Sequence, residues 1–299
     1  MTPYAATGMI PDAAGSALLR DYIDRWQLRP DGRAFATTSS VLQPVLWRPN
    51  PDAAEQPAML KVAQHGAAAD EERNGFALQH WWNRRGAAQV FASSSHAIVM
   101  ERALGRRSLS TMSLRLSVAD DDHALRLLCQ TVSRLHEPRD QPAPPLTALD
   151  QRFAELFAHA DSLGGAYLRG ADIAAELLNE QGEAVVLHGD VHHDNVLDFS
   201  EHGWLAIDPK GLLGAREFDY VNMLCNPSRT RASEHKRLSR RVKTVALASG
   251  IEASSLLRWT IAWTALSASW FSTSDQPEEA QQTLAIGDTA TRILLETAL

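Results

Sequence analysis

Polar side chains able to do chemistry concentrate in one stretch of the chain, residues 184–214. Its sequence is AVVLHGDVHHDNVLDFSEHGWLAIDPKGLLG, with four histidines and four aspartates set among short apolar runs. Two kinds of chemistry fit this composition. The histidines suggest a transition-metal site, whereas the aspartates together with Asn195 suggest a site for phosphoryl transfer.

The metal interpretation uses His188, Asp190, His192 and His193, side-chain types that bind zinc in hydrolases. A catalytic zinc ion usually takes further ligands from distant segments, and the other histidines are not obviously placed to supply them. A zinc-dependent hydrolase stays open as an alternative, but it explains only the histidines.

The phosphotransfer interpretation uses Asp190, Asn195 and Asp208. Asn195 follows Asp190 by five residues, and Asp208 comes after two apolar runs that predict a β-hairpin. Protein kinases have the same order of a base, an amide and a metal-binding carboxylate. ATP arrives with Mg²⁺, a hard ion that prefers oxygen ligands, so we expect Asn195 and Asp208 to hold the metal. Asp190 would accept a hydrogen bond from the attacking hydroxyl.

A lysine upstream supports the same interpretation. A kinase needs a strand Lys to bind the phosphates and a helix Glu to orient it. Lys61 is the only charge in AMLKVA, residues 58–63, and Glu72 follows eleven residues later. A lone Lys in a strand is more often an exposed edge charge, but the partner and the downstream triplet favour the phosphate role. Glu71 is an alternative partner for Lys61.

The first third of the chain predicts mostly β structure, which would carry Lys61. Apolar runs bounded by turn residues predict strands over 34–48, 58–63, 87–92 and 96–102, and a helix over 71–82 with Asp70 as its N-cap.

Beyond about residue 103 the apolar residues recur mainly at helical spacing. A loop over 136–145 and β structure between 185 and 208 interrupt the helices. We therefore expect an α+β fold with a small β-rich N-terminal lobe, residues 1–103, and a larger, mostly helical lobe, residues 104–299.

Composition limits the classes of function. The 299 residues carry a net charge of −7, which argues against a nucleic-acid partner. No run approaches the length of a membrane span, and residues 1–15 lack the basic and apolar regions of a secretory signal. The two cysteines do not make a disulfide framework, which fits a reducing cytoplasm. The oligomeric state is not indicated.

The motifs together resemble a known family. HGDVHHDN is similar to the catalytic loop of aminoglycoside phosphotransferases, which have HGD where protein kinases have HRD. WLAIDPKGLLG, FDYVNMLCNP and EERNGFALQHWWNRRGAAQV resemble the branch that contains streptomycin 6-phosphotransferase and hydroxyurea phosphotransferase. The similarity runs in order from about Thr37 to the last helices, so it covers most of the chain.

The resemblance implies a two-lobed protein-kinase-like fold that binds ATP and Mg²⁺. It implies that Asp190 is the catalytic base, that Asn195 and Asp208 are metal ligands, and that Lys61 and Glu72 form the phosphate-binding pair.

It also implies that the backbone near Glu101 and Ala103 meets the adenine and that Asp219 supports the catalytic loop. The turn over the phosphates, TTSSVLQPV, has no glycine, so we expect Ser39 and Ser40 to contact the phosphates.

The expected activity is ATP-dependent phosphorylation of a small-molecule hydroxyl, most simply that of an aminoglycoside such as streptomycin. Streptomycin is cationic, so carboxylates must hold it, and Asp194 and Glu217 are the candidates. A kinase of another small metabolite and a nucleotide-binding protein without catalysis are the alternatives. Lys210 directly follows the DP motif and receives no catalytic role.

Overall fold

The computed structural model describes residues 8–64, 68–180 and 182–297, and within α2 it describes the side chains from Glu72 onward. The chain forms two compact units. Unit 1 comprises Met1–Ser108, Arg139–Pro145 and Leu197–Gly211, and unit 2 comprises Leu109–Pro138, Leu146–Val196 and Leu212–Leu299. The sequence predicts a boundary between two lobes at residue 103. In the structure, unit 1 continues to Ser108 and also includes two later segments of the chain.

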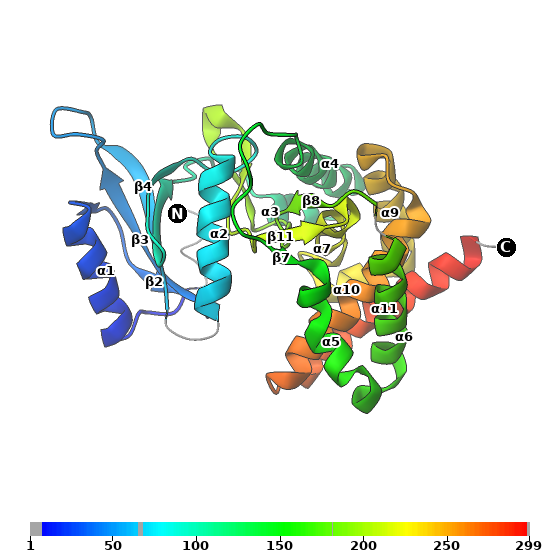
Figure 1. The fold of residues 1–299 in the computed structure, drawn as a ribbon. Helices are drawn as coiled ribbons and strands as arrows, with labels where there is room; N and C mark the ends of the chain where they lie inside the picture. Colours follow the sequence, from blue (N-terminus) through cyan, green and yellow to red (C-terminus); the bar gives the residue numbers. More distant parts are fainter. Residues whose placement is uncertain (1–7, 65–67, 181, 298–299) are drawn as a thin grey trace. The chain divides into compact units, whose positions relative to one another are not determined.

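Unit 1 is built around a sheet with the order β1-β3-β4-β6-β5, in which β2 also pairs with β3. Figure 1 labels β2, β3 and β4 of this sheet. The strands are antiparallel. Their bounds are β1 Arg29–Pro30, β2 Phe35–Ala36, β3 Ser40–Trp47, β4 Gln56–Ala63, β5 Val90–Ser93 and β6 Ala97–Glu101. The four predicted strands are confirmed, except that a turn at residues 37–39 divides the first into β2 and β3.

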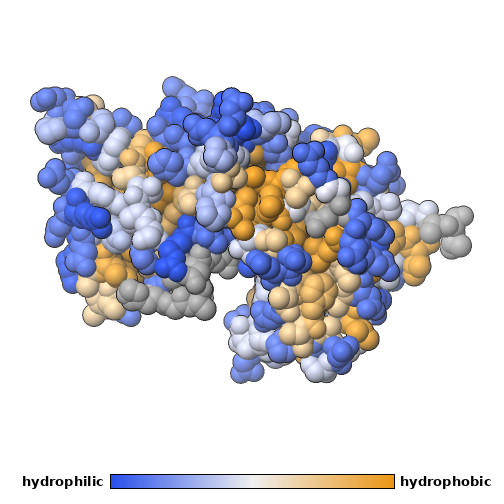
Figure 2. Space-filling view, viewed as in Figure 1, coloured by the Kyte–Doolittle hydropathy of each residue, from blue (hydrophilic) through white to orange (hydrophobic). Residues whose placement is uncertain are grey.

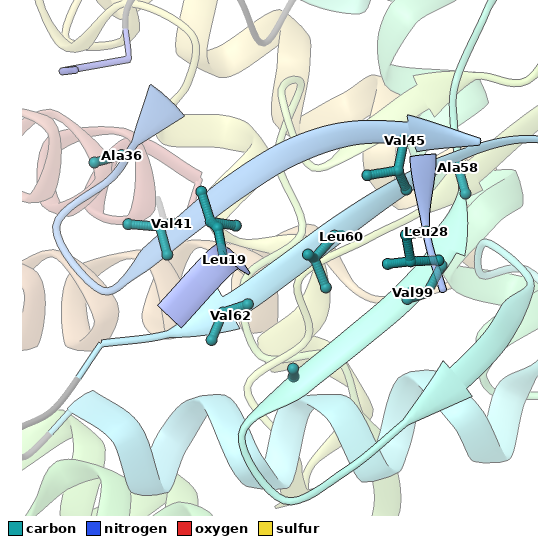
Figure 3. Packing of buried hydrophobic residues seen from close by; sticks show 10 residues of the cluster. Leu19, Leu28, Ala36, Val41, Val45, Ala58, Leu60, Val62 and Val99 are labelled. Atoms are coloured by element: carbon teal, nitrogen blue, oxygen red, sulfur yellow. The ribbon is translucent and has the colours of Figure 1, made fainter. Parts of the chain in front are cut away.

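Two helices accompany this sheet, α1 Ala13–Arg25 and α2 Ala68–Trp82. The sequence predicts α2 but not α1. The prediction of Asp70 as the N-cap of α2 is wrong, because the helix begins two residues earlier, at Ala68. Helix α1 begins after Asp12, whose side chain accepts the N–H of Gly15 as an N-cap does. Leu19 of α1 packs with Val41, Leu60 and other aliphatic side chains on one face of the sheet (Figure 3).

The predicted hairpin forms and belongs to unit 1. It consists of β9 Val196–Asp198 and β10 Trp204–Ala206, joined by a short 3-10 helix η2, Ser200–His202. A second apolar cluster joins Leu197 and Leu205 of the hairpin to Leu42 and Met100 of the sheet. The hairpin therefore completes the core of unit 1.

Asp198 ties the segment after β6 to this hairpin. Its backbone oxygen accepts the N–H of Gly105 at 2.9 Å, and Arg107 binds both of its carboxylate oxygens at 2.8 Å. The hydrogen bonds from Arg107 lower the pKa of Asp198, and the Arg107 guanidinium also lies over the ring of Trp204.

Unit 2 is mostly helical around a small sheet of order β7-β11-β8. The strands are β7 Thr147–Ala148, β8 Val185–Leu187 and β11 Leu212–Gly214. The helices are α3 Leu109–Leu114, α4 Val118–Leu135, α5 Leu149–Leu163, α6 Gly165–Glu180, η3 Arg216–Tyr220, α7 Asn222–Cys225, α8 Arg229–Ala232, α9 His235–Ser249, α10 Ala253–Thr273 and α11 Pro277–Thr297.

An aromatic cluster forms part of the core of unit 2. Trp259 of α10 is buried and packs against Phe153 of α5 and Phe218 of η3. Figure 2 shows hydrophobic side chains exposed where Figure 1 draws α5 and α6, and these helices carry the partly exposed Phe157 and Leu168. Among the described residues, no helix combines the length and hydropathy that a membrane crossing requires.

Candidate active site

Lys61 is buried on β4, at the centre of the sheet. Its Nζ lies 2.6 Å from a carboxylate oxygen of Glu72 and also pairs with Asp208. The predicted pair of Lys61 and Glu72 is therefore formed, and Asp208 joins it. The side chain of the alternative partner, Glu71, lies outside the described residues.

The segment that carries Asp208 lies directly against α2. Asp208 has φ +63° and Gly211 has φ +68°, so the backbone turns sharply on either side of Pro209 and Lys210. A Cβ atom on Gly75 of α2 would lie 2.2 Å from the backbone oxygen of Pro209. Glycine at position 75 thus permits the close approach that brings Glu72 and Asp208 to the same lysine. Lys210 Nζ lies 3.8 Å from Asp208.

The glycine-free turn before β3 is held by its own hydroxyl groups. Thr37 Oγ1 accepts the N–H of Ser40 and donates to the Ser40 oxygen, each at 3.2 Å. Ser39 Oγ donates to Glu72 at 2.5 Å, and Ser40 is fully buried. The two predicted phosphate contacts thus have different surroundings: Ser39 touches the glutamate that orients Lys61, and Ser40 is packed inside unit 1.

Glu101, one of the two predicted adenine contacts, ends β6, and the other, Ala103, comes two residues later. The N–H of Glu101 donates to the Gln89 oxygen at 2.8 Å, and its carboxylate pairs with His202 of the hairpin. Ala103 belongs to the apolar cluster that also contains Met100 and Ile207. The end of this segment therefore packs against the apolar core of unit 1.

The loop after β8 presents Asp190, whose side chain is 29% exposed. Asn195 Nδ2 donates to one carboxylate oxygen at 3.1 Å and to the Asp190 backbone oxygen at 2.9 Å. Asn222 Nδ2 donates to the other carboxylate oxygen at 2.7 Å. The sequence predicts Asp190 and Asn195, whereas it does not identify Asn222. Asn222 comes three residues after Asp219 on a helical segment, and this spacing is the sequence signal that places both side chains on the same side of the helix.

Asp219 on η3 supports this loop, as expected. Its two carboxylate oxygens accept the N–H groups of His188 and Gly189 at 2.9 and 2.7 Å, and His136 Nε2 lies 2.8 Å away. Burial alone would raise the pKa of Asp219, but the bond and charge of His136 and the N–H of Gly189 lower it overall. Asp219 therefore stays ionised and fixes the backbone just before Asp190.

A buried ionic cluster supports the other end of the loop. Arg241 of α9 is fully buried, donates to His193 Nε2 at 3.3 Å, and lies 3.7 Å from Asp121 of α4. Burial lowers the pKa of Arg241 to about 9 although Asp121 opposes the shift. Burial, together with the charge of Arg241, also lowers the pKa of His193 far below its ordinary value, so His193 is a neutral acceptor.

These contacts overturn the zinc alternative. His193 faces a buried arginine, and His188 Nδ1 accepts the N–H of Asp190 at 3.2 Å. Over the ranges that the structure describes, no group of three His, Cys, Asp or Glu side chains is arranged to hold a metal ion. The histidines shape the loop.

The two predicted substrate carboxylates lie in unit 2. Asp194 is exposed, and one of its oxygens accepts Ser110 Oγ at 2.6 Å. Glu217 lies half-buried on η3, two residues before Asp219. The predicted site residues thus form one set in each unit: Lys61, Glu72 and Asp208 in unit 1, and Asp190 and Asn195 in unit 2.

Comparison with known sequences adds independent information. Residues 25–275 match the family model described as aminoglycoside/hydroxyurea antibiotic resistance kinase. A streptomycin 3″-kinase from Klebsiella pneumoniae is 44% identical over 83% of this chain and 90% of that protein. A streptomycin 6-kinase from Streptomyces griseus is 33% identical over 68% of this chain and 64% of that protein.

Solved structures with low sequence identity share the fold. A choline/ethanolamine kinase family protein from Mesorhizobium loti has a TM-score of 0.62 and 13% identity, covering 94% of this chain and 95% of that one. A streptomycin–ATP complex of the aminoglycoside phosphotransferase APH(2″)-IIa has a TM-score of 0.51 and 14% identity, covering 86% and 90%. With the protein-kinase-like fold and the family match together, the chain belongs to the aminoglycoside/hydroxyurea antibiotic resistance kinases, which are phosphotransferases acting on hydroxyl groups.

Proposed function

We propose that this kinase transfers the γ-phosphoryl group of ATP to a hydroxyl of streptomycin and acts in the cytoplasm, where ATP is available. The observation that carries the reaction class is the buried Lys61 held between Glu72 and Asp208. A lysine fixed by carboxylates on a central strand is the device by which kinases bind the phosphates of ATP.

Each unit offers an oxygen donor of the kind that a magnesium ion takes. Asp208 is 30% exposed and offers carboxylate oxygens. Asn195 turns its amide nitrogen toward Asp190, so its Oδ1 points the other way. Two oxygen donors supplemented by phosphate and water oxygens are the ligands that Mg²⁺ takes in such enzymes. An ion held by Asp208 and Asn195 would neutralise charge on the phosphates.

The remaining steps belong to the chain's own groups. Lys61 would bind phosphate oxygens, and the apolar cluster beside Glu101 and Ala103 would receive the adenine ring. Asp190 would accept a hydrogen bond from the acceptor hydroxyl and orient it toward the phosphorus atom. Its carboxylate is prepared for this because two amides already fix its rotation. Positioning and charge neutralisation then supply most of the rate enhancement.

We propose the 3″-hydroxyl as the position that is phosphorylated. The relative with 44% identity over most of its length is named a 3″-kinase, whereas the 6-kinase is 33% identical over a smaller share. The sequence motifs resemble the branch that contains streptomycin 6-phosphotransferase but leave open which hydroxyl is phosphorylated. Streptomycin carries two guanidinium groups, which favour carboxylate partners. Asp194 is the stronger candidate, because it is exposed and lies four residues from Asp190.

The test is to incubate the purified protein with Mg-ATP and streptomycin and to locate the phosphate by NMR spectroscopy. We expect 3″-O-phosphostreptomycin. Asp190→Ala should lower kcat by at least about 100-fold, as expected on removing a general base, with nearly unchanged ATP binding. Asp208→Ala should weaken ATP binding in Mg²⁺. A 6-phosphorylated product would refute only the position, while another phosphorylated acceptor with no reaction on streptomycin would refute the substrate.

A further inference from the structure

Both oxygens of the Asp190 carboxylate are occupied by side-chain amides. Asn195 Nδ2 donates to Oδ2 at 3.1 Å, and Asn222 Nδ2 donates to Oδ1 at 2.7 Å. An ionised carboxylate can only accept hydrogen bonds, so both amides must turn their nitrogen atoms toward it. Asn195 has a further task in the proposed reaction as a metal ligand. Asn222 has no other role in the proposed reaction, so its contact with Asp190 needs a separate explanation.

Asn226 determines which end of the Asn222 amide faces Asp190. Asn226 Nδ2 donates to Asn222 Oδ1 at 2.7 Å and to the Asn222 backbone oxygen at 3.1 Å. Because the Asn226 nitrogen is a donor only, the oxygen of Asn222 must face Asn226 and its nitrogen must face Asp190. The three side chains therefore form a one-way chain of hydrogen bonds that ends on the base.

The location of Asn222 suits this role. It is buried at the start of α7, directly after η3, whose Asp219 binds the backbone N–H groups of His188 and Gly189. One short segment thus contacts the catalytic loop twice. Asp219 fixes the backbone ahead of Asp190, and Asn222 fixes the carboxylate itself.

We propose that Asn222 is a positioning residue for Asp190 and that Asn226 acts through it by selecting the orientation of its amide. The proposal rests on the proposed function, since it requires Asp190 to orient the acceptor hydroxyl. With one oxygen released, the carboxylate rotates more freely and presents the correct oxygen in a smaller fraction of encounters. Turnover falls, while nucleotide binding does not depend on this contact.

Asn222→Ala should lower kcat by about 10- to 100-fold, the range expected on loss of a hydrogen bond to a charged group. The KM of the acceptor and the Kd of Mg-ATP should change by less than about 3-fold, because no ground-state contact to either ligand is removed. Ser228→Ala is the matched control. It removes the N-cap of α8 two residues after Asn226, does not touch Asp190, and should leave kcat unchanged.

The sharper test compares two variants of Asn226. Asn226→Ala removes one donor, after which Asn222 still turns its nitrogen toward Asp190. Asn226→Asp has nearly the same shape but only accepts, so the Asn222 amide turns over and its oxygen faces the carboxylate of Asp190. We expect Asn226→Asp to be at least about 10-fold slower than Asn226→Ala, because the oxygen of Asn222 then faces the carboxylate of Asp190 and both groups only accept hydrogen bonds. A purely structural role predicts the opposite order, since Asp replaces Asn with little change in volume.

A double variant separates amide orientation from the new negative charge. In Asn222→Ala/Asn226→Asp no amide remains to turn over, so kcat should equal that of Asn222→Ala alone. If the double variant instead lowers kcat by the product of the two single effects, the new negative charge at position 226 acts on Asp190 directly. The proposed role of amide orientation is then wrong. Circular dichroism and thermal unfolding check that each protein folds. If Asn222→Ala does not fold, the two Asn226 variants decide between the models.

The outcomes distinguish this inference from the proposed function. An active wild type with an inactive Asp190→Ala establishes the base, whichever acceptor is used. Equal kcat in the wild type, Asn222→Ala and Asn226→Asp would then overturn the positioning role and leave the function intact. Retained activity in Asp190→Ala would instead overturn the role of Asp190 as the base and with it the positioning role of Asn222, while phosphate transfer itself would stand.

Discussion

Gly75 of α2 offers a direct test of how closely the helix must approach the Asp208 segment. A Cβ atom added at this position would lie 2.2 Å from the backbone oxygen of Pro209, whereas ordinary contacts begin near 3.4 Å. In Gly75→Ala the two backbones must therefore separate by about 1 Å. Because Glu72 and Asp208 lie on the two sides of this contact, Lys61 would lose simultaneous pairing with both.

Two effects oppose each other in this variant, and their magnitudes decide the result. Ala stabilises a helix interior by about 1 kcal/mol relative to Gly. Overpacking a rigid contact costs about 1–3 kcal/mol, and a misplacement of about 1 Å at an active site can reduce activity about 100-fold. We expect a net loss of stability in urea, a weaker Kd for Mg-ATP in titration calorimetry, and a large fall in kcat/KM.

Ala77→Gly is the matched control for Gly75→Ala. It lies on an exposed part of the same helix, so it should cost about 1 kcal/mol of stability and leave nucleotide affinity unchanged. The reasoning would be refuted if Gly75→Ala were more stable than the wild type and bound Mg-ATP with the same Kd.

Three further predictions follow from the environment of single residues. Asp219→Asn should lower stability by about 3 kcal/mol or more at neutral pH, since a buried paired charge is lost. Because the folded pKa of Asp219 is depressed, its contribution is present above the unfolded pKa of about 3.9 and is lost as pH falls below it, so urea midpoints of wild type and variant should converge in acid. Burial raises the pKa of Cys129 and of Cys225 to about 12, so neither should react with a thiol reagent at pH 8 until the protein unfolds, and rapid labelling of native protein would contradict this. Asp194→Asn should raise the streptomycin KM, more at low salt than at high salt, and equal KM values for the two proteins would exclude the contact.

Spacing in the sequence is enough to predict contacts between residues that lie on one segment or on consecutive elements. Asp190 and Asn195 share a loop, and their five-residue separation lets the amide fold back onto the carboxylate. Lys61 and Glu72 lie on consecutive elements, so the order of strand and helix was sufficient.

The partners that arrive from elsewhere in the chain could not be predicted in the same way. Asn222 reaches Asp190 only because η3 and α7 pack beside the loop after β8. Its spacing from Asp219 places it on the same side of a helical segment but does not identify Asp190 as its partner. The charges of Asp121 and Arg241 are indistinguishable in the sequence from charges on an exposed helix face. Their burial is a result of packing between α4 and α9.

The Asp198 contacts of Gly105 and Arg107 have a consequence for building hybrid enzymes. A crossover near residue 103, where the sequence suggests a clean junction, would combine the sheet of one parent with the hairpin of another. Leu197 and Leu205 of the hairpin would then pack against core side chains of the other parent, and Asp198 would face a different sequence after β6. A Cβ at position 105 would lie 2.0 Å from Asp198 Cγ, so even one substituted glycine would block the junction. Hybrids should therefore exchange residues 139–145 and 197–211 together with residues 1–108, as one block that is discontinuous in the gene.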